Sequence, residues 1–297
     1  QSGNSTPMPE PRSRPEPNFD SDRETLIKWI AYMDNYGQRW LDDIGKDYFS
    51  QEYWYLFTVA LVSHWRQAPL SVSEACDCMK TGSPKTRQNR LQKLITEHML
   101  FKTKEATDLR RTHLEPTEAM LHGGRIHFRN SLTEAIQFLD ESDMLASCPE
   151  PLLKRISESS DDVDTRYLLP WAEFLVDYTN DWNTTFKKLF HTEEYWYAFV
   201  HSLLGAWKGA PLTMSEACQS MRTGSSRTKE KRVSLAVTRG MLIKQRSSSD
   251  LRTTHVLASA TLEALLIGHF ERTLHKLMAL TRLLLAPEMS DDSPAHP

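Results

Sequence analysis

The sequence predicts a mainly helical protein that consists of two tandem copies of one unit, each with a small β-hairpin. A gapless internal repeat is the first observation, because Ser73–His113 aligns with Ser215–His255 without insertion or deletion. We call this constant separation the repeat offset. All eight tryptophans pair at the repeat offset: Trp29 with Trp171, Trp40 with Trp182, Trp54 with Trp196 and Trp65 with Trp207. Such regularity indicates duplication of a whole structural unit. The length of 297 residues agrees with two domains.

The composition is typical of a globular protein, with 39% hydrophobic and 25% charged residues. No run of about 18 apolar residues occurs, so we expect no membrane-spanning helix. The absence of a signal-peptide pattern predicts a cytoplasmic protein. The four cysteines, Cys76, Cys78, Cys148 and Cys218, lack the spacing of a zinc site. We therefore expect no metal and no cofactor, with Cys76 and Cys218 as small apolar side chains at matching positions.

The net charge limits the kind of nucleic-acid binding that is expected, and the polar stretches mark the boundaries of the units. A net charge of −3 argues against a protein that coats nucleic acid indiscriminately, but it allows a local basic face. Residues 1–19 are rich in proline and polar side chains, so we expect them to form a disordered arm. We place the first unit at 20–148, a polar connector at 149–163, the second unit at 164–287 and a disordered tail at 288–297.

Each unit is expected to begin with two aromatic helices. Trp29, Tyr36 and Trp40 recur on one helical face from about Ser21, and the repeat places Trp171, Tyr178 and Trp182 in the same pattern. A second helix follows Ser50 in the first unit and Thr192 in the second. Both residues are N-cap candidates, with Glu52 and Glu194 in the first turn, where the helix dipole favours an anion.

A short helix, a turn and a longer basic helix come next. Ser71 to Glu74 and Thr213 to Glu216 have the pattern of a capping box, which opens a helix. Thr81–Ser83 and Thr223–Ser225 predict the turn and the cap of the following helix, which extends to about His98 or Gly240. Hairpin strands are expected at residues 99–102 and 112–114, and at the matching positions of the second unit. Terminal helices are expected at about 117–139 and 259–285.

This order of elements is the layout of a winged helix-turn-helix. It resembles the multiple antibiotic resistance regulator (MarR) family of bacterial transcription factors over nearly the whole chain, twice. The motifs that carry the resemblance are Ser73–Ala75, Thr86, Met99–Phe101 and Asp108-x-Arg110, with Ser215–Ala217, Thr228, Gly240–Ile243 and Asp250-x-Arg252 in the second copy. The resemblance implies an intramolecular pseudo-dimer. His98 departs from the pattern where Gly240 keeps it, so we expect the first hairpin to be entered differently.

A helix of this kind can enter the major groove and present its first turns to base edges. The candidate DNA contacts are Ser83, Lys85, Thr86, Arg87, Asn89 and Arg90, with Ser225, Arg227, Thr228, Lys229, Lys231 and Arg232 in the second unit. By resemblance, Arg110 or Arg252 at the hairpin tip reaches the minor groove, and Asp108 or Asp250 holds it in place. Arg111 is a further candidate DNA contact. The alternative interpretation is a solvated, charged helix face.

The aromatic helices suggest a second site. Related regulators bind small aromatic acids between these helices and the DNA-binding lobe. The candidate ligand-binding residues are Trp29, Tyr36, Arg39, Trp40, His64, Trp171, Tyr178, Trp182 and His201. The carboxylate of the ligand would pair with Arg39, His64 or His201, or with Arg66. The alternative is that the tryptophans pack the core, since aromatic side chains bury large areas.

We therefore expect a DNA-binding transcriptional regulator that responds to a small, aromatic acid ligand. One chain would read an imperfect inverted repeat of double-stranded DNA with its two fused units. The alternative is a tandem winged-helix module that binds proteins and has no sequence-specific DNA contact. No nucleophile and base, metal cluster or phosphate-binding glycine loop stands out, so we do not expect an enzyme. Pairing of two chains into a larger assembly stays open.

Overall fold

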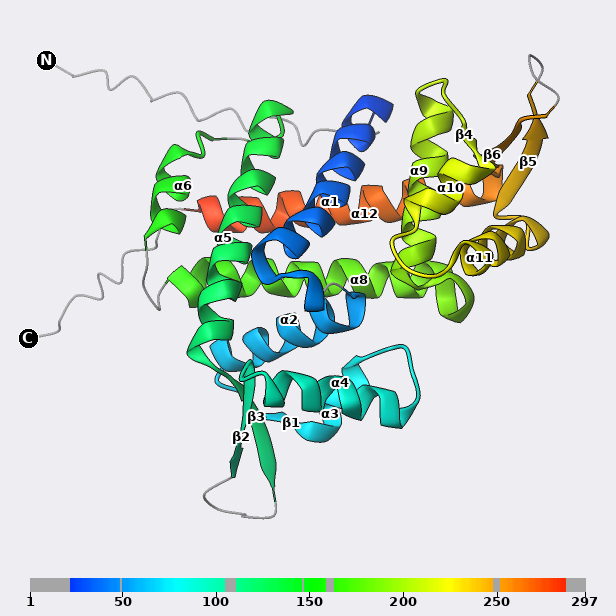
Figure 1. The fold of residues 1–297 in the computed structure, drawn as a ribbon. Helices are drawn as coiled ribbons and strands as arrows, with labels where there is room; N and C mark the ends of the chain where they lie inside the picture. The colour runs from blue at the N-terminus through cyan, green and yellow to red at the C-terminus, as the bar shows by residue number, and fades with distance from the viewer. Residues whose placement is uncertain are drawn as a thin grey trace, which may run out of the picture.

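The computed structural model describes residues 22–48, 50–104, 111–145, 147–158, 163–247 and 252–286. Within them the protein is mainly helical, with two three-stranded antiparallel sheets at matching positions in the two halves (Figure 1). The predicted arm at 1–19 and tail at 288–297 lie outside the described residues.

The elements of the two halves follow the same order. The first half contains α1 (Arg23–Ile44), η1 (Lys46–Tyr48), α2 (Gln51–Trp65), β1 (Leu70–Ser71), α3 (Val72–Cys78), α4 (Pro84–Thr96), β2 (Leu100–Lys104), β3 (Thr112–Pro116) and α5 (Glu118–Glu141). The second contains α8 (Leu169–Phe190), α9 (Glu193–Trp207), β4 (Leu212–Thr213), α10 (Met214–Ser220), α11 (Ser226–Thr238), β5 (Leu242–Arg246), β6 (Thr254–Ala258) and α12 (Ala260–Leu285). From α2 to β3, every element has a counterpart at the repeat offset.

Within the described part of the connector, two short elements lie between the halves. Helix α6 (Glu150–Ser157) occupies part of the segment that we placed as a connector, and it buries Leu152 and Ile156. A π-helical turn, η2 (Asp164–Leu168), leads directly into α8. The link between the halves thus contributes buried apolar side chains of its own.

The local signals of the sequence produce the expected helix starts. The capping boxes form as predicted, with Ser71 and Glu74 bonded to each other's backbone N–H and Thr213 and Glu216 doing the same. Ser50 and Thr192 occupy N-cap positions, but their side chains make no capping hydrogen bond. The sequence did not predict β1 and β4, the short strands that complete the two sheets, because a two-residue strand has no periodicity of its own.

The expectation that the first hairpin is entered differently is wrong. His98 has φ 55° and Gly240 has φ 72°, so both residues adopt the left-handed conformation. The backbone bonds also match: Met99 N–H donates to the Leu94 carbonyl at 2.9 Å, and Met241 N–H donates to that of Ala236 at 2.9 Å. Tertiary structure holds a histidine where glycine is favoured, at a cost of about 1–2 kcal/mol.

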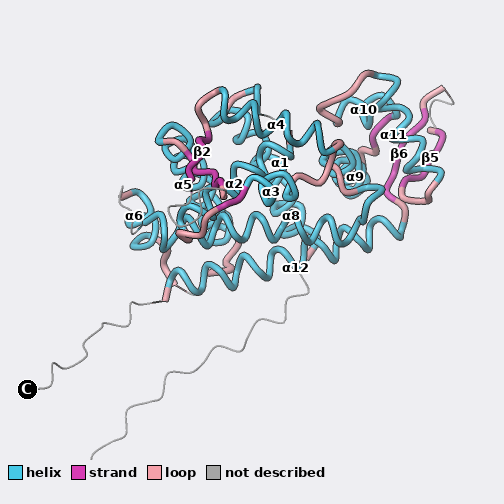
Figure 2. The backbone as a smooth tube through the Cα atoms, turned by 90° about the horizontal axis from the view of Figure 1, so that it is seen from below, coloured by secondary structure: helices cyan, strands magenta, loops and turns pink. Residues whose placement is uncertain are grey.

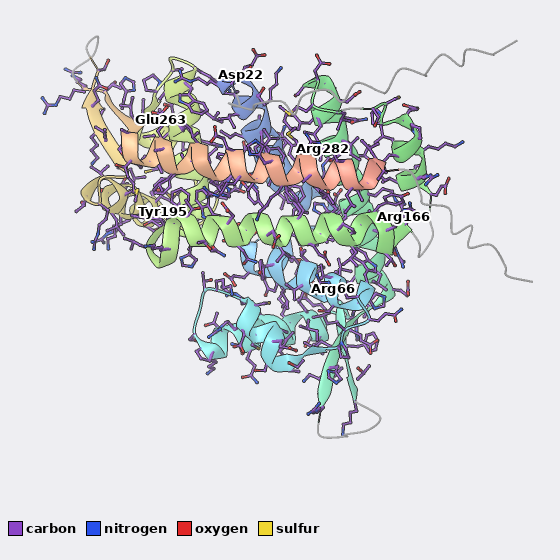
Figure 3. All side chains as sticks on the ribbon, turned by 180° about the vertical axis from the view of Figure 1, so that it is seen from behind. Asp22, Arg66, Arg166, Tyr195, Glu263 and Arg282 are labelled. Atoms are coloured by element: carbon purple, nitrogen blue, oxygen red, sulfur yellow. The ribbon has the colours of Figure 1, made fainter. Side chains whose placement is uncertain are left out.

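Helices from both halves form one core. In each half the first and last helices pack together, α1 with α5 and α8 with α12. Figure 3 shows α8 and α12 side by side and antiparallel, since Arg166, in η2 just before α8, lies toward the same end of the pair as Arg282, and Glu263 lies at the opposite end of α12. Across the halves, α1 contacts α12 and α2 contacts α8. In Figure 2, α4, α10 and α11 lie toward the side of the molecule opposite α12.

Two crossed hydrogen bonds join the halves inside this core. The indole N–H of Trp29 donates to Thr273 Oγ1 at 3.1 Å, and the indole N–H of Trp171 donates to Ser131 Oγ at 2.8 Å. Trp29 and Trp171 are repeat partners, and so are Ser131 and Thr273. Both indoles are fully buried. The repeated halves are therefore packed with an approximate twofold relation.

Candidate functional site

The turn before α4, and its copy before α11, is built from short-range contacts. Gly82 has φ 90°, a conformation that glycine adopts without strain. Ser83 then caps α4 by accepting the Thr86 N–H at 3.2 Å, and Ser225 caps α11 by accepting the Thr228 N–H at 3.3 Å. These contacts fix where each basic helix begins.

Four of the basic candidates turn back onto this turn. Arg90 Nη1 donates to the Thr81 carbonyl at 2.9 Å, and Arg232 Nη1 donates to that of Thr223 at 3.1 Å. Arg87 donates to the carbonyl oxygens of Cys76 and Met79 at 3.3 and 3.5 Å, and Lys229 donates to that of Met221. In this conformation, these side chains brace the turn and the end of the short helix before it, α3 or α10.

A buried carboxylate completes each brace from the preceding helix. Glu52 at the start of α2 accepts the Thr81 N–H at 3.1 Å, and Glu194 at the start of α9 accepts the Thr223 N–H at 3.0 Å. Both glutamates are buried, and burial raises the pKa of Glu52. The orientation of α4 and α11 is thus tied to α2 and α9. Sequence reasoning assigned these glutamates to the helix dipole and missed this role.

The remaining candidates on α4 and α11 are exposed at the start of each helix. They are Ser83, Lys85, Thr86 and Asn89 on the first helix, and Ser225, Arg227, Thr228 and Lys231 on the second. The exposed positions between them differ, with Gln88 on α4 and Glu230 on α11. Arg111 and Arg252, beside the two hairpins, are also exposed. Arg110, Asp108 and Asp250 lie outside the described residues.

A cavity of about 120 Å³ lies between the halves. Its lining residues come in pairs at the repeat offset: Met33 with Leu175, Tyr36 with Tyr178, Gly37 with Thr179, Trp40 with Trp182, Gln51 with Glu193 and Trp54 with Trp196, together with Tyr197. We call it the axial cavity, because this pairing places it on the approximate twofold axis. Four of our ligand-binding candidates, Tyr36, Trp40, Tyr178 and Trp182, line it.

The aromatic walls are held by hydrogen bonds behind them. The indole N–H groups of Trp54 and Trp196 donate to the hydroxyl oxygens of Tyr36 and Tyr178 at 2.8 and 3.0 Å. Those of Trp40 and Trp182 donate to the carbonyl oxygens of Tyr48 and His191 at 2.9 and 3.1 Å. All four indole N–H groups therefore have hydrogen-bond partners within the protein.

Buried histidines stand behind the two tyrosines. His127 lies 3.0 Å from the Tyr36 hydroxyl through Nε2 and 2.8 Å from Asp43 through Nδ1. Burial lowers the pKa of His127, so the neutral ring donates its Nδ1–H to Asp43 and accepts the tyrosine proton at Nε2. His269 in the second half donates to Asp181 at 2.7 Å. Asp181 occupies the repeat position of Arg39, so the second half draws its carboxylate from an earlier helical turn.

One acidic side chain lines the axial cavity. Burial, and secondly the charge of Glu194, raises the pKa of Glu193 to about 7, although the Gln51 backbone N–H and the charge of Arg222 act in the opposite direction. Gln51 stands at the same repeat position in the first half, and its Oε1 accepts the Glu193 backbone N–H at 3.1 Å. Glu193 forms no salt bridge with any residue that the structure describes. Sequence reasoning missed this pair, although a glutamine opposite a glutamate in a matching repeat was a visible signal.

The other ligand-binding candidates lie elsewhere. Trp29 and Trp171 form the crossed bonds of the core. Arg39 forms an ion pair with Glu134, and His201 lies 3.2 Å from Asp34. His64 lines a separate, wider hollow beside the first hairpin, and Arg66 bonds to Glu173 of α8 at 2.6 Å. None of these polar candidates lines the axial cavity.

No protein-family model matches this chain, and no curated protein is significantly similar to it. Among the described residues, no helix is long and apolar enough to cross a membrane. The same residues contain no group of three or more His, Cys, Asp or Glu side chains that could hold a metal ion. The four cysteines are unpaired, and Cys76 and Cys218 are partly buried at matching positions of α3 and α10.

Proposed function

We propose that this protein is a DNA-binding transcriptional regulator in which two winged helix-turn-helix units are fused into an intramolecular pseudo-dimer. The observation that carries the proposal is the repetition of a capped helix, a braced turn and a basic helix in both halves, with exposed polar side chains at the same positions. The crossed Trp29 and Trp171 bonds support packing of the halves as one particle. The order of elements supports the resemblance to the MarR family.

In this proposal α4 and α11 each enter a major groove. Lys85 and Asn89 on α4, and Arg227 and Lys231 on α11, are the exposed side chains best suited to bases or phosphates. Asn favours adenine, whereas Lys favours guanine or a phosphate, and Asn89 matches Lys231 across the repeat. The two half-sites should therefore differ, giving an imperfect inverted repeat about one helical turn apart.

We further propose that a small ligand controls DNA binding through the axial cavity, whose walls are aromatic. Gln51 and Glu193 line the cavity, while the next residues, Glu52 and Glu194, hold the turns that precede α4 and α11. A ligand that displaces the start of α2 or α9 would thus shift the basic helices. A ligand changes DNA affinity only to the extent that it binds the two arrangements differently.

A second candidate function is a tandem winged-helix module that binds proteins. It is favoured by the inward bonds of Arg87, Arg90, Lys229 and Arg232, which reduce the positive charge that α4 and α11 display. It is also consistent with the net charge of −3.

Selection from a random duplex library, followed by fluorescence anisotropy at several salt concentrations, tests the proposal. We expect an asymmetric inverted repeat to be enriched and its affinity to fall as salt rises. Lys85→Ala should reduce the salt slope by about one if Lys85 contacts a phosphate. Gln92→Ala, at an exposed position farther along α4, is the matched control. Failure to enrich any duplex would favour the protein-binding module.

A further inference from the structure

We propose that the axial cavity binds a small organic cation, such as the trimethylammonium head of a quaternary amine, and not an aromatic acid. This inference deepens the proposed function, but the binding step itself does not depend on DNA. Three features support it: the aromatic walls, the lack of a positive side chain among the described lining residues, and one acidic side chain that the repeat does not duplicate.

The walls of the cavity suit a cation. A ring face is electron-rich, so a cation within about 6 Å of a Trp or Tyr ring centroid is attracted to it. Trp40, Trp54, Trp182 and Trp196 surround the cavity, and their N–H groups are bonded elsewhere. The Tyr197 ring already has a cation beside it, since the Arg222 guanidinium lies 4.3 Å from its centroid, so the four indoles are the walls left for a ligand.

The same lining is unfavourable for a carboxylate. A buried anion needs hydrogen-bond donors or a positive partner. Among the residues that the structure describes, no Lys, Arg or His lines the cavity. The four indole N–H groups and the Tyr36 hydroxyl have partners inside the protein. The Gln51 amide and the hydroxyls of Tyr178 and Tyr197 could still donate, but Glu193 lines the same cavity and would repel a second carboxylate.

Glu193 supplies the charge that a cation requires when its carboxyl group is ionised, so binding is measured above about pH 7, the value to which burial raises the pKa of Glu193. It lines the cavity at the first residue of α9, and it has no salt bridge to a described residue that would already neutralise it. The opposite position of the repeat holds the neutral Gln51, so the lining carries one carboxylate. One carboxylate matches one positive charge on the ligand. Because Gln51 and Glu193 differ, the charged end of the ligand has one preferred side of the cavity, which two identical halves would not provide.

The volume limits the ligand to a small group. An apolar cavity of about 150 Å³ holds one benzene ring, and the axial cavity has about 120 Å³. A trimethylammonium head or a single ring is therefore the largest group that can enter without movement of the walls.

Binding of three probes to the full chain tests the proposal by quenching of Trp fluorescence, with calorimetry as a second measurement. The probes are choline, its uncharged carbon isostere 3,3-dimethylbutan-1-ol, and benzoate. We expect saturable binding of choline at least about tenfold tighter than that of the isostere, which has the same shape without the charge. Benzoate should bind more weakly than choline.

The chain provides its own matched variants. Glu193→Gln makes the cavity symmetric with respect to Gln51, and it should weaken choline about tenfold while leaving the isostere unchanged. Gln51→Glu adds a second carboxylate and should not weaken choline. Arg222→Gln separates the alternatives, because it should spare choline binding, whereas an acid held by Arg222 would be lost. Circular dichroism confirms that each variant is folded.

Three results would overturn the proposal: no saturable binding of choline, equal affinity for choline and the isostere, or tighter binding of benzoate. The DNA measurement is made separately. Choline binding without any DNA binding would contradict the proposed function and leave the ligand class intact. DNA binding without choline binding would contradict the ligand class alone.

Discussion

The crossed hydrogen bonds between the halves provide a sharp test of the fused architecture. Thr273→Val keeps the shape of the side chain but removes the hydroxyl that accepts the Trp29 N–H at 3.1 Å. Both residues are fully buried, so the indole N–H would lose its partner without gaining water. We expect the free energy of unfolding to fall by about 1–3 kcal/mol, which corresponds to a melting temperature lower by several degrees.

Helix α12 contains a matched control. Thr281 is also fully buried, and its hydroxyl bonds only to the Leu277 carbonyl of its own helix, at 2.9 Å, among the described residues. Thr273 makes the same kind of bond, to the Phe270 carbonyl at 3.1 Å. Thr281→Val therefore removes the local bond alone. The difference between the two variants isolates the bond that crosses the halves.

A double-mutant cycle completes the test. Urea unfolding is followed by Trp fluorescence and circular dichroism, whose agreement checks for a single transition. In a Trp29→Phe background the indole N–H is already gone, so Thr273→Val should cost no more than Thr281→Val. An equal cost of Thr273→Val in both backgrounds would refute the reasoning, because the crossed bond would then contribute nothing.

Three further outcomes are expected. His98→Gly should stabilise the protein and Gly240→His should destabilise it, by about 1 kcal/mol each, because both positions have positive φ; urea unfolding measures this, and a reversed order would contradict it. Burial lowers the pKa of His127 and His269 below that of an unfolded histidine, which is about 6.5. As the pH falls through this value the unfolded chain takes up protons before the folded one does, so the free energy of unfolding should decrease. This is best measured in Glu193→Gln, because Glu193, whose pKa is raised to about 7, contributes with the opposite sign; constant stability between about pH 7.5 and about pH 5.5 would rule it out. Asn89→Lys should change base preference in one half-site only, by about 1–3 kcal/mol per contact, and a change in both half-sites of the selected duplex would argue against one chain reading both.

Local sequence signals were sufficient for the helix starts and the order of elements. A capping box joins residues three apart, as in Ser71 and Glu74, so its formation depends on few distant contacts. The repeat offset likewise carried over from the tryptophans to the sheets: Leu70 pairs with Leu114, and Leu212 pairs with Val256. For these features the determining interactions lie close together in the chain.

Tertiary packing decided which polar and aromatic side chains form a site. Arg90 and Arg232 looked like base-reading residues, but each guanidinium group donates to a carbonyl of a folded turn nine residues earlier. Trp29 and Trp40 share one helical face, yet Trp29 meets Thr273 of the other half and Trp40 meets the axial cavity. The place of Glu193 in that cavity also arises only when α9 packs beside the first half. The sequence by itself determined the two copies, their capping boxes and the gapless alignment between them, because these depend on neighbours along the chain. The site depended on contacts between residues that are far apart in the sequence.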